Sequence, residues 1–425
     1  MSCARHSASV FSTGKDLVVI GRLAHYPLLP LSRGFAAAGL AIALASPARA
    51  QDHQHPAPAD EHAAHSAEAG PWTIALHGSL FVQYIQEWAP IHRGSHQFGS
   101  INWFMGTAQR RAGGGQIGVR GMFSLEPWTI PGCGYPDLLA TGELCEGDGL
   151  HDRQHPHDLF MEIAGEYERP LSAGSGLSWR VYGGPAGEPA LGPTAFPHRA
   201  SAASNPVAPI SHHWLDATHI SFGVVTAGLS GSRWRVEASA FNGREPDEQR
   251  TGVDLAPLDS FSGRITIRPR PSLAIQVSAG RLESAEQDFA NGPRYDITRV
   301  TASAQYERGR LAGTLAWGTN TERGQQTHAG LAEANVTLGH GAAFARAELN
   351  SKPSHSLHIH EQPGAILTVG KLQGGYVHYL RAVRGLQMGL GTSGSAALVP
   401  PSIRPNYSGV GFGIAVFAHV RPASR

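Results

Sequence analysis

A short stretch of the chain, residues 151–158, gathers side chains that can bind a metal ion. It reads His-Asp-Arg-Gln-His-Pro-His-Asp. In an extended segment His155 and His157 point to the same side, because side chains two apart share a face. Neutral imidazole with a nearby carboxylate suits Zn(II), Cu(II) or Ni(II). The alternative is that these side chains only satisfy backbone groups exposed by an irregular loop.

A second stretch of the same kind lies further along the chain. It reads Ser-His-His-Trp-Leu-Asp-Ala-Thr-His over residues 211–219. The two stretches end the long connections 127–157 and 184–217, and loops beyond about 12–15 residues are usually functional or disordered. Residues 183–198 are apolar, proline-rich and almost uncharged, so we expect a packed loop. The candidate metal ligands are His151, Asp152, His155, His157, Asp158, His212, His213 and His219.

The segments between the connections alternate apolar and polar residues with period two, as residues 233–240 do. This period predicts strands with one apolar and one polar face. Short connections, such as 112–114 and 231–232, alternate with long ones, such as 319–327. This alternation of short and long connections is typical of an up-and-down barrel in an outer membrane and not of a Greek-key sandwich. The two long connections would fold together into the lumen.

The predicted fold is therefore all-β: a transmembrane up-and-down antiparallel β-barrel of about 16 strands. A merged or missed hairpin would change the count to about 14 or 18. Charged residues recur on the polar face of these strands, and a charge facing lipid costs about 2–4 kcal/mol at mid-membrane. The residues expected to line the lumen are Arg120, Glu162, Glu166, Arg180, Arg235, Glu237, Arg264, Arg268, Arg299, Glu333, Arg346, Glu348 and Lys371.

The start of the chain has the pattern of a secretory signal peptide. Arg33 precedes an uncharged run over residues 34–45, and Ala48-Arg49-Ala50 is a small-x-small cleavage site. The alternative, a membrane anchor, needs about 20 apolar residues, and this run is shorter. We expect a signal peptide at 1–50, a disordered His-rich periplasmic tail at 51–70 and the barrel at 71–425.

Cysteine usage agrees with export. Cys3 lies in the predicted signal peptide, which leaves Cys133 and Cys145 in one connection. A pair at short spacing in an oxidising compartment predicts a local disulfide. The alternative, two thiol metal ligands, is less favoured because neither cysteine belongs to a Cys-x-x-Cys pair.

Charge and composition limit the kinds of partner that the protein is expected to bind. The formal net charge is +1, and no basic stripe suggests nucleic acid. The expected partners are outer-membrane lipid and small solutes or metal ions, with copper or zinc as the candidate bound metals. The pattern favours a pore or transport barrel over an enzyme. An outer-membrane hydrolase, or a structural or adhesive barrel without transport, stays open as the alternative.

Several motifs together resemble a family of bacterial outer-membrane barrel proteins. They are HDRQHPHDLFME at residues 151–162, Tyr-Gly-Gly-Pro at 182–185 through Gly192-Pro193, Ser-His-His at 211–213 and Phe-Asn-Gly-Arg-Glu-Pro-Asp at 241–247. The resemblance covers about residues 72–420 and not the His-rich tail. It implies a barrel in the outer membrane of a Gram-negative bacterium and a loose link to the handling of copper and other heavy metals. It names no substrate.

Overall fold

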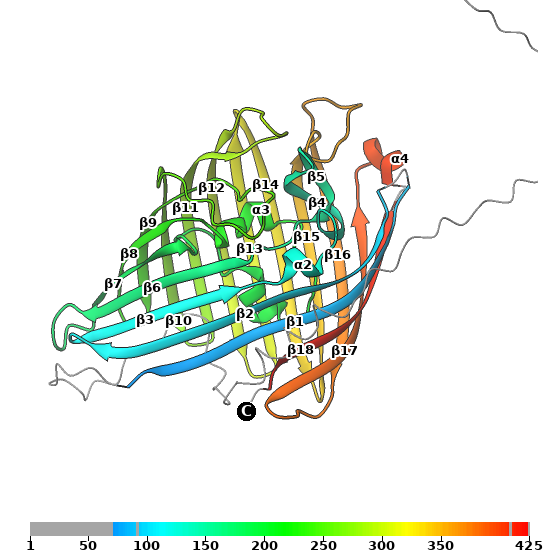
Figure 1. The fold of residues 1–425 in the computed structure, drawn as a ribbon. Helices are drawn as coiled ribbons and strands as arrows, with labels where there is room; N and C mark the ends of the chain where they lie inside the picture. Colours follow the sequence, from blue (N-terminus) through cyan, green and yellow to red (C-terminus); the bar gives the residue numbers. More distant parts are fainter. Residues whose placement is uncertain (1–70, 91–92, 408–409, 424–425) are drawn as a thin grey trace, which may run out of the picture. The chain divides into compact units, whose positions relative to one another are not determined.

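The computed structural model describes residues 71–425 except 91–92, 408–409 and 424–425. Within this part of the chain, sixteen strands close into one antiparallel barrel (Figure 1). The barrel closes because β1 pairs with β2 on one side and with β18 on the other. This architecture confirms the predicted fold class and strand number. The predicted signal peptide at 1–50 and the tail at 51–70 lie outside the described residues.

The barrel wall is built in chain order apart from the insertion of β4 and β5. Its strands are β1 (Thr73–Trp88), β2 (His96–Ala112), β3 (Gly115–Phe123), β6 (Phe160–Pro170), β7 (Ser178–Ala186), β8 (Val224–Ser230), β9 (Trp234–Phe241), β10 (Ser260–Arg270), β11 (Leu273–Glu286), β12 (Tyr295–Arg308), β13 (Leu311–Glu322), β14 (Gln325–Leu338), β15 (Gly341–Pro353), β16 (Ile366–Tyr379), β17 (Leu386–Leu398) and β18 (Val410–Pro422).

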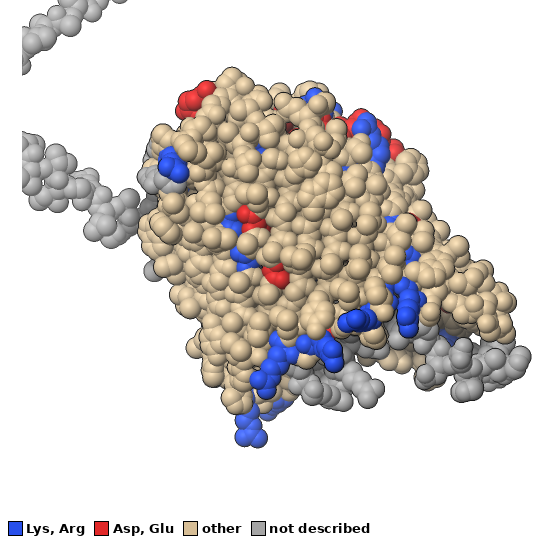
Figure 2. All heavy atoms as spheres, turned by 180° about the vertical axis from the view of Figure 1, so that it is seen from behind, with Lys and Arg blue, Asp and Glu red and all other residues tan. Residues whose placement is uncertain are grey.

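Alternation along each strand gives the wall an apolar outer face. On β18, Phe412, Ile414 and Val416 are exposed, whereas Ala415 and Phe417 are buried on the inner side. The part of the wall seen in Figure 2 is largely uncharged, and Lys and Arg gather toward one end. A closed barrel with such a band is an outer-membrane protein of Gram-negative bacteria. Among the described residues, no helix is long and apolar enough to cross a membrane.

Short turns join the strands at one end of the barrel, and long connections join them at the other, which we call the loop end. One connection at the loop end departs from the prediction. β13 and β14 are joined by Arg323 and Gly324 alone, both with positive φ, as in a tight hairpin. The predicted long connection 319–327 is therefore wrong. Its polar residues continue the strand pairing, with Thr319 opposite His328 and Glu322 opposite Gln325.

Two long connections enter the lumen. Residues 124–159, the hairpin loop, contain α2 (Glu126–Thr129) and a separate sheet of β4 (Tyr135–Cys145) and β5 (Asp148–Gln154). Residues 187–223, the crossing loop, contain the short helices η1 (Phe196–His198), η2 (Ala200–Ala202), α3 (His212–Leu215) and η3 (Ala217–His219). Figure 1 shows α2, α3 and the β4–β5 hairpin inside the outline of the wall.

The crossing loop is bonded to the inner wall along its length. The backbone N–H of Ala190 donates to Ser239 Oγ at 2.7 Å, and that of Gly192 donates to Ser278 Oγ at 2.8 Å. Further along, the N–H of Ser211 donates to Glu348 Oε1 at 3.0 Å. Because buried backbone groups must be paired, these inward polar side chains hold the loop across the lumen.

Apolar side chains also meet inside the barrel. Phe81 and Phe417 project inward from the wall and share one buried cluster with Phe196 and Val207 of the crossing loop and Tyr135 of the hairpin loop. At this level the lumen is filled by packed side chains rather than lined by charge alone. The loops are therefore fixed relative to the wall, and the side chains they carry have defined positions.

Candidate metal centre

Five histidines from the two inner loops converge in the lumen. They are His155, His157, His212, His213 and His219, all buried, and we call them the histidine cluster. The ring centroids of His155 and His212 lie 5.9 Å apart, and those of His155 and His213 lie 5.7 Å apart. His212 lies 5.4 Å from His213 and 5.3 Å from His219, and His157 lies 5.4 Å from His219.

Local structure places these rings. His155 and His157 follow β5 on either side of Pro156, which restricts the residue before it to extended backbone. His212 and His213 occupy the single turn of α3, and His219 ends η3. Both short helices belong to the crossing loop, so the bonds that hold this loop to the wall also hold three of the imidazoles in place.

Three of the rings are oriented through Nδ1. His212 Nδ1 lies 2.8 Å from Asp216 Oδ1, and His157 Nδ1 lies 2.9 Å from Glu126 Oε1. His219 Nδ1 donates to the carbonyl oxygen of Asp216 at 2.8 Å. Metal-bound imidazoles usually donate one nitrogen to a carboxylate or carbonyl in this way, which leaves the other nitrogen as the ligand.

Several Nε2 atoms of the histidine cluster lack hydrogen-bond partners. Nε2 of His155, of His213 and of His219 is buried without a hydrogen bond. A buried polar atom left unpaired costs about 1–3 kcal/mol, so several such atoms in one cluster need an explanation. His155 Nε2 has one carboxylate oxygen in reach, Glu143 Oε1 at 3.3 Å.

Burial sets the protonation of these rings. It lowers the pKa of His212 to about 4, against the opposing effect of Asp216. Burial also places the pKa of His155 and that of His219 well below the usual value. These three rings are therefore neutral at pH 7, which is the form that binds metal. For His157, Glu126 outweighs burial and raises the pKa.

A chain of ion pairs joins the cluster to the wall. Arg199, wholly buried in the crossing loop, places Nη1 2.6 Å from Asp216 Oδ2 and Nε 2.6 Å from Glu333 Oε1 on β14. Asp216 in turn binds His212. Arg346 on β15 completes the chain, with Nε 2.9 Å from Glu333 Oε2. The orientation of His212 therefore depends on charges in the wall.

The connection 242–259, which joins β9 to β10, forms ion pairs with the hairpin loop. Arg250 pairs with Glu143 on β4 and, at 3.4 Å, with Asp158. Burial raises the pKa of Asp158 to about 7, although Arg250 opposes this shift. Asp158, one of the predicted ligands, thus forms an ion pair with Arg250 and not with an imidazole of the histidine cluster.

Two other predicted ligands are held elsewhere. The ring of His151 stacks on that of His358, with centroids 4.0 Å apart. Asp152 pairs with Arg93 at 2.6 Å and accepts from the Leu139 backbone N–H at 2.8 Å, where Leu139 has a positive φ. The structure thus brings together five of the eight predicted ligands and gives Asp152 a structural role in the hairpin.

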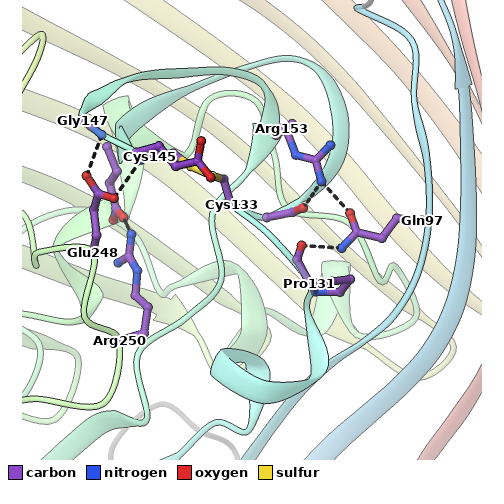
Figure 3. Close-up of a disulfide and its surroundings, with 11 residues drawn as sticks. Gln97, Pro131, Cys133, Cys145, Gly147, Arg153, Glu248 and Arg250 are labelled. Carbon is purple, nitrogen blue, oxygen red and sulfur yellow. Dashed lines mark hydrogen bonds and ion pairs between the residues drawn. A yellow bond between two sulfur atoms is a disulfide. The ribbon is translucent and has the colours of Figure 1, made fainter. Parts of the chain in front are cut away.

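Cys133 and Cys145 form a disulfide across the β4–β5 region (Figure 3). Beside it, Arg153 donates to Gln97 Oε1 at 2.7 Å, which ties the hairpin loop to β2. On the other side, Glu248 accepts from the Gly147 backbone N–H at 3.1 Å. The disulfide and these bonds fix the strand that carries Glu143.

The charged residues predicted to line the lumen lie on the wall faces opposite the exposed apolar side chains. Several of them pair with one another or with the loops. Arg180 lies 2.6 Å from Glu166 and 2.9 Å from Glu237, and Lys371 pairs with Asp137 of the hairpin loop. The inner wall therefore carries a network of ion pairs, and some of its charged residues bind the inner loops.

The prediction from sequence missed the carboxylates around the cluster. Glu245 Oε1 lies 3.0 Å and Glu286 Oε1 3.7 Å from His213 Nδ1. Burial and the neighbouring Glu286 raise the pKa of Glu245 to about 8. These two glutamates, against the opposing effect of burial, raise the pKa of His213 to about 10. Glu126 and Glu143 were missed as well. No spacing signal links such residues to a histidine, because each comes from a different part of the chain.

No protein-family model matches the chain, and no curated protein matches it. Solved structures similar to it include an anion-selective porin from Comamonas acidovorans, with 13% identity, TM-score 0.47 and coverage of 83% of this chain and 100% of that one. OmpT of Vibrio cholerae matches with 8% identity, TM-score 0.48 and coverage of 84% and 99%. The channel DcaP of Acinetobacter baumannii matches with 9% identity, TM-score 0.49 and coverage of 82% and 97%. At these scores the likeness carries no argument about function.

Proposed function

We propose that this porin-like barrel binds a divalent transition-metal ion inside its lumen and handles metal ions or their complexes at the constriction made by its inner loops. Barrels of sixteen to eighteen strands are wide enough for an aqueous channel. Here the crossing loop occupies that space. A solute that passes between the loop and the wall would meet the histidine cluster.

The observation that carries this proposal is the set of buried, unpaired Nε2 atoms. Nε2 of His155 and Nε2 of His219 lack hydrogen-bond partners, and both rings lie within 6 Å of His212, centroid to centroid. Neutral imidazoles with Nδ1 held by an acceptor suit Zn(II), Cu(II) and Ni(II). We take His155, His212 and His219 as the candidate ligands, with His157 beside them. Their ligand nitrogens do not all lie within 4.8 Å of one another, so these rings must move together to share one ion.

Among the described residues, the contacts around His212 do not support the hydrolase alternative. His212 and Asp216 form a dyad, but a hydrolase would also need a nucleophile within reach of the imidazole. The hydroxyl of the adjacent Ser211 donates to Glu348 Oε1 at 2.7 Å, away from His212. The geometry favours binding over nucleophilic catalysis.

Titration of Zn(II) into purified barrels tests the proposal. The parent should lack residues 51–70, because that tract contains four histidines of its own. His155→Ala with His157→Ala should weaken binding by about 10- to 100-fold. His355→Ala with His360→Ala, two exposed positions in the 354–365 connection, should leave it unchanged. If the cluster only stabilises the loops, the first double variant will lower heat stability but bind Zn(II) as the parent does, and the proposal is then wrong.

A further inference from the structure

His213 differs from the other members of the histidine cluster in the direction its ring faces. Its Nε2 side is closed by backbone, since a Cβ added at Gly142 would lie 2.2 Å from that nitrogen. Gly142 has φ +119°, a conformation that side chains other than glycine rarely adopt. β4 therefore carries glycine where the imidazole packs against it. Only the Nδ1 side of His213 is left for a ligand.

That side faces two carboxylates. His213 Nδ1, one oxygen of Glu245 and one oxygen of Glu286 all lie within 4.8 Å of one another. Neither nitrogen of His213 makes a hydrogen bond, and Glu245 Oε1 also lacks a hydrogen-bond partner. His213 is only 5% exposed. A buried ring is thus aimed at two acids and lies at ion-pair distance from both.

The spacing fits a coordinated ion. Ligand atoms about 2.1 Å from a tetrahedral ion lie about 3.4 Å apart. The distances from His213 Nδ1 to the two glutamate oxygens, 3.0 and 3.7 Å, lie on either side of this value. The shorter distance, 3.0 Å to Glu245, also lies within the range of about 2.7–3.2 Å for a hydrogen bond, so an ion bound here would replace a proton held between the imidazole and the glutamates.

The surroundings favour a cation here. Two carboxylates held side by side repel each other unless one of them is protonated or a positive charge lies beside them. Tyr295 steadies one of them, because its hydroxyl donates to Glu286 Oε2 at 3.2 Å. The neighbouring Arg299 donates from its Nε to Asn320 at 3.0 Å, and its charge also acts on Glu286 and Glu245. Glu322, at the end of β13, adds further negative charge near Glu286.

We infer that His213, Glu245 and Glu286 form a second divalent-metal site, separate from the imidazole ligands His155, His212 and His219. One nitrogen and two carboxylate oxygens make a harder ligand set than imidazoles alone and suit Zn²⁺, Co²⁺, Fe²⁺ or Mn²⁺. The site does not require the imidazole ligands to be occupied. Both glutamates are partly exposed, so an ion can reach this site before it reaches the deeper rings.

Co²⁺ titration of the barrel lacking residues 51–70, followed by visible absorption, tests the inference. The parent should bind two equivalents, and Glu245→Gln with Glu286→Gln should lose one of them. The matched control is Glu283→Gln with Glu361→Gln, a partly exposed and an exposed glutamate, which should keep both equivalents. Heat-modifiable migration on gels verifies that each variant is folded.

The outcomes separate this site from the proposed function. If His155→Ala with His157→Ala removes one equivalent and the Glu245/Glu286 variant removes the other, both sites stand. If only the glutamate variant loses an equivalent, the second site stands and the imidazole site fails. If the glutamate variant binds as many equivalents as its control, with unchanged affinity, the second site does not exist.

Discussion

Arg199→Met is the change that best tests how the crossing loop is held. The guanidinium is fully buried and pairs with Asp216 and Glu333 at 2.6 Å each. Breaking a buried ion pair costs about 3–5 kcal/mol, because the partner charge is left uncompensated. Arg346 still pairs with Glu333 and His212 still binds Asp216. We therefore expect a loss of about 3 kcal/mol in the free energy of unfolding.

Urea unfolding of the barrel in lipid vesicles measures this loss, and about 3 kcal/mol corresponds to a change of about a hundredfold in the unfolding equilibrium constant. The matched control is Arg281→Met, because Arg281 also contacts two carboxylates but is 48% exposed. Exposed pairs contribute about 0–1 kcal/mol. The freed crossing loop should also raise conductance in planar bilayers. Equal losses of stability in the two variants would refute the reasoning that buried ion pairs hold the loop.

Three further outcomes are expected. A cysteine placed in the 242–259 connection should react with a membrane-impermeant maleimide on intact cells and one at Gly309 should not, because long loops face outward; the reverse pattern would contradict the topology. Burial, and after it the charge of His358, lowers the pKa of His151. Because the unfolded chain then binds a proton more readily than the folded one, the free energy of unfolding falls as pH drops below about 6.5. In His151→Phe the difference in melting temperature between pH 7.5 and 5.5 should therefore shrink, and an unchanged difference would count against this assignment. Mass spectrometry of unreduced, alkylated protein should find Cys133 and Cys145 unlabelled, whereas two labelled thiols would exclude the disulfide.

The wall could be predicted from sequence because lipid imposes one rule on every strand. Outward residues must be apolar, so Phe412, Ile414 and Val416 alternate with small or polar inward neighbours. The rule weakens beyond the membrane. Residues 319–327 are polar on both faces there, so the sequence shows no apolar–polar alternation, although the strands stay paired as far as Glu322 and Gln325.

The inner loops followed no such rule. Residues 135–145 contain Pro136 and two non-glycine residues with positive φ, Leu139 and Glu143, which obscures the strand pattern of β4. Histidine type and spacing did indicate the cluster, because few other roles gather imidazoles so densely. The carboxylate partners could not be predicted, since Glu245, Glu286 and His213 come from three separate segments that meet only in the folded barrel.

The central claim is that the imidazoles of the lumen bind a metal ion. Crystals of the barrel lacking residues 51–70, soaked in Zn(II) and measured above and below the zinc absorption edge, locate bound zinc directly. We expect an anomalous difference peak about 2.0–2.1 Å from Nε2 of His155, His212 and His219. Zinc found only at other positions, with the cluster empty at saturating Zn(II), would contradict it.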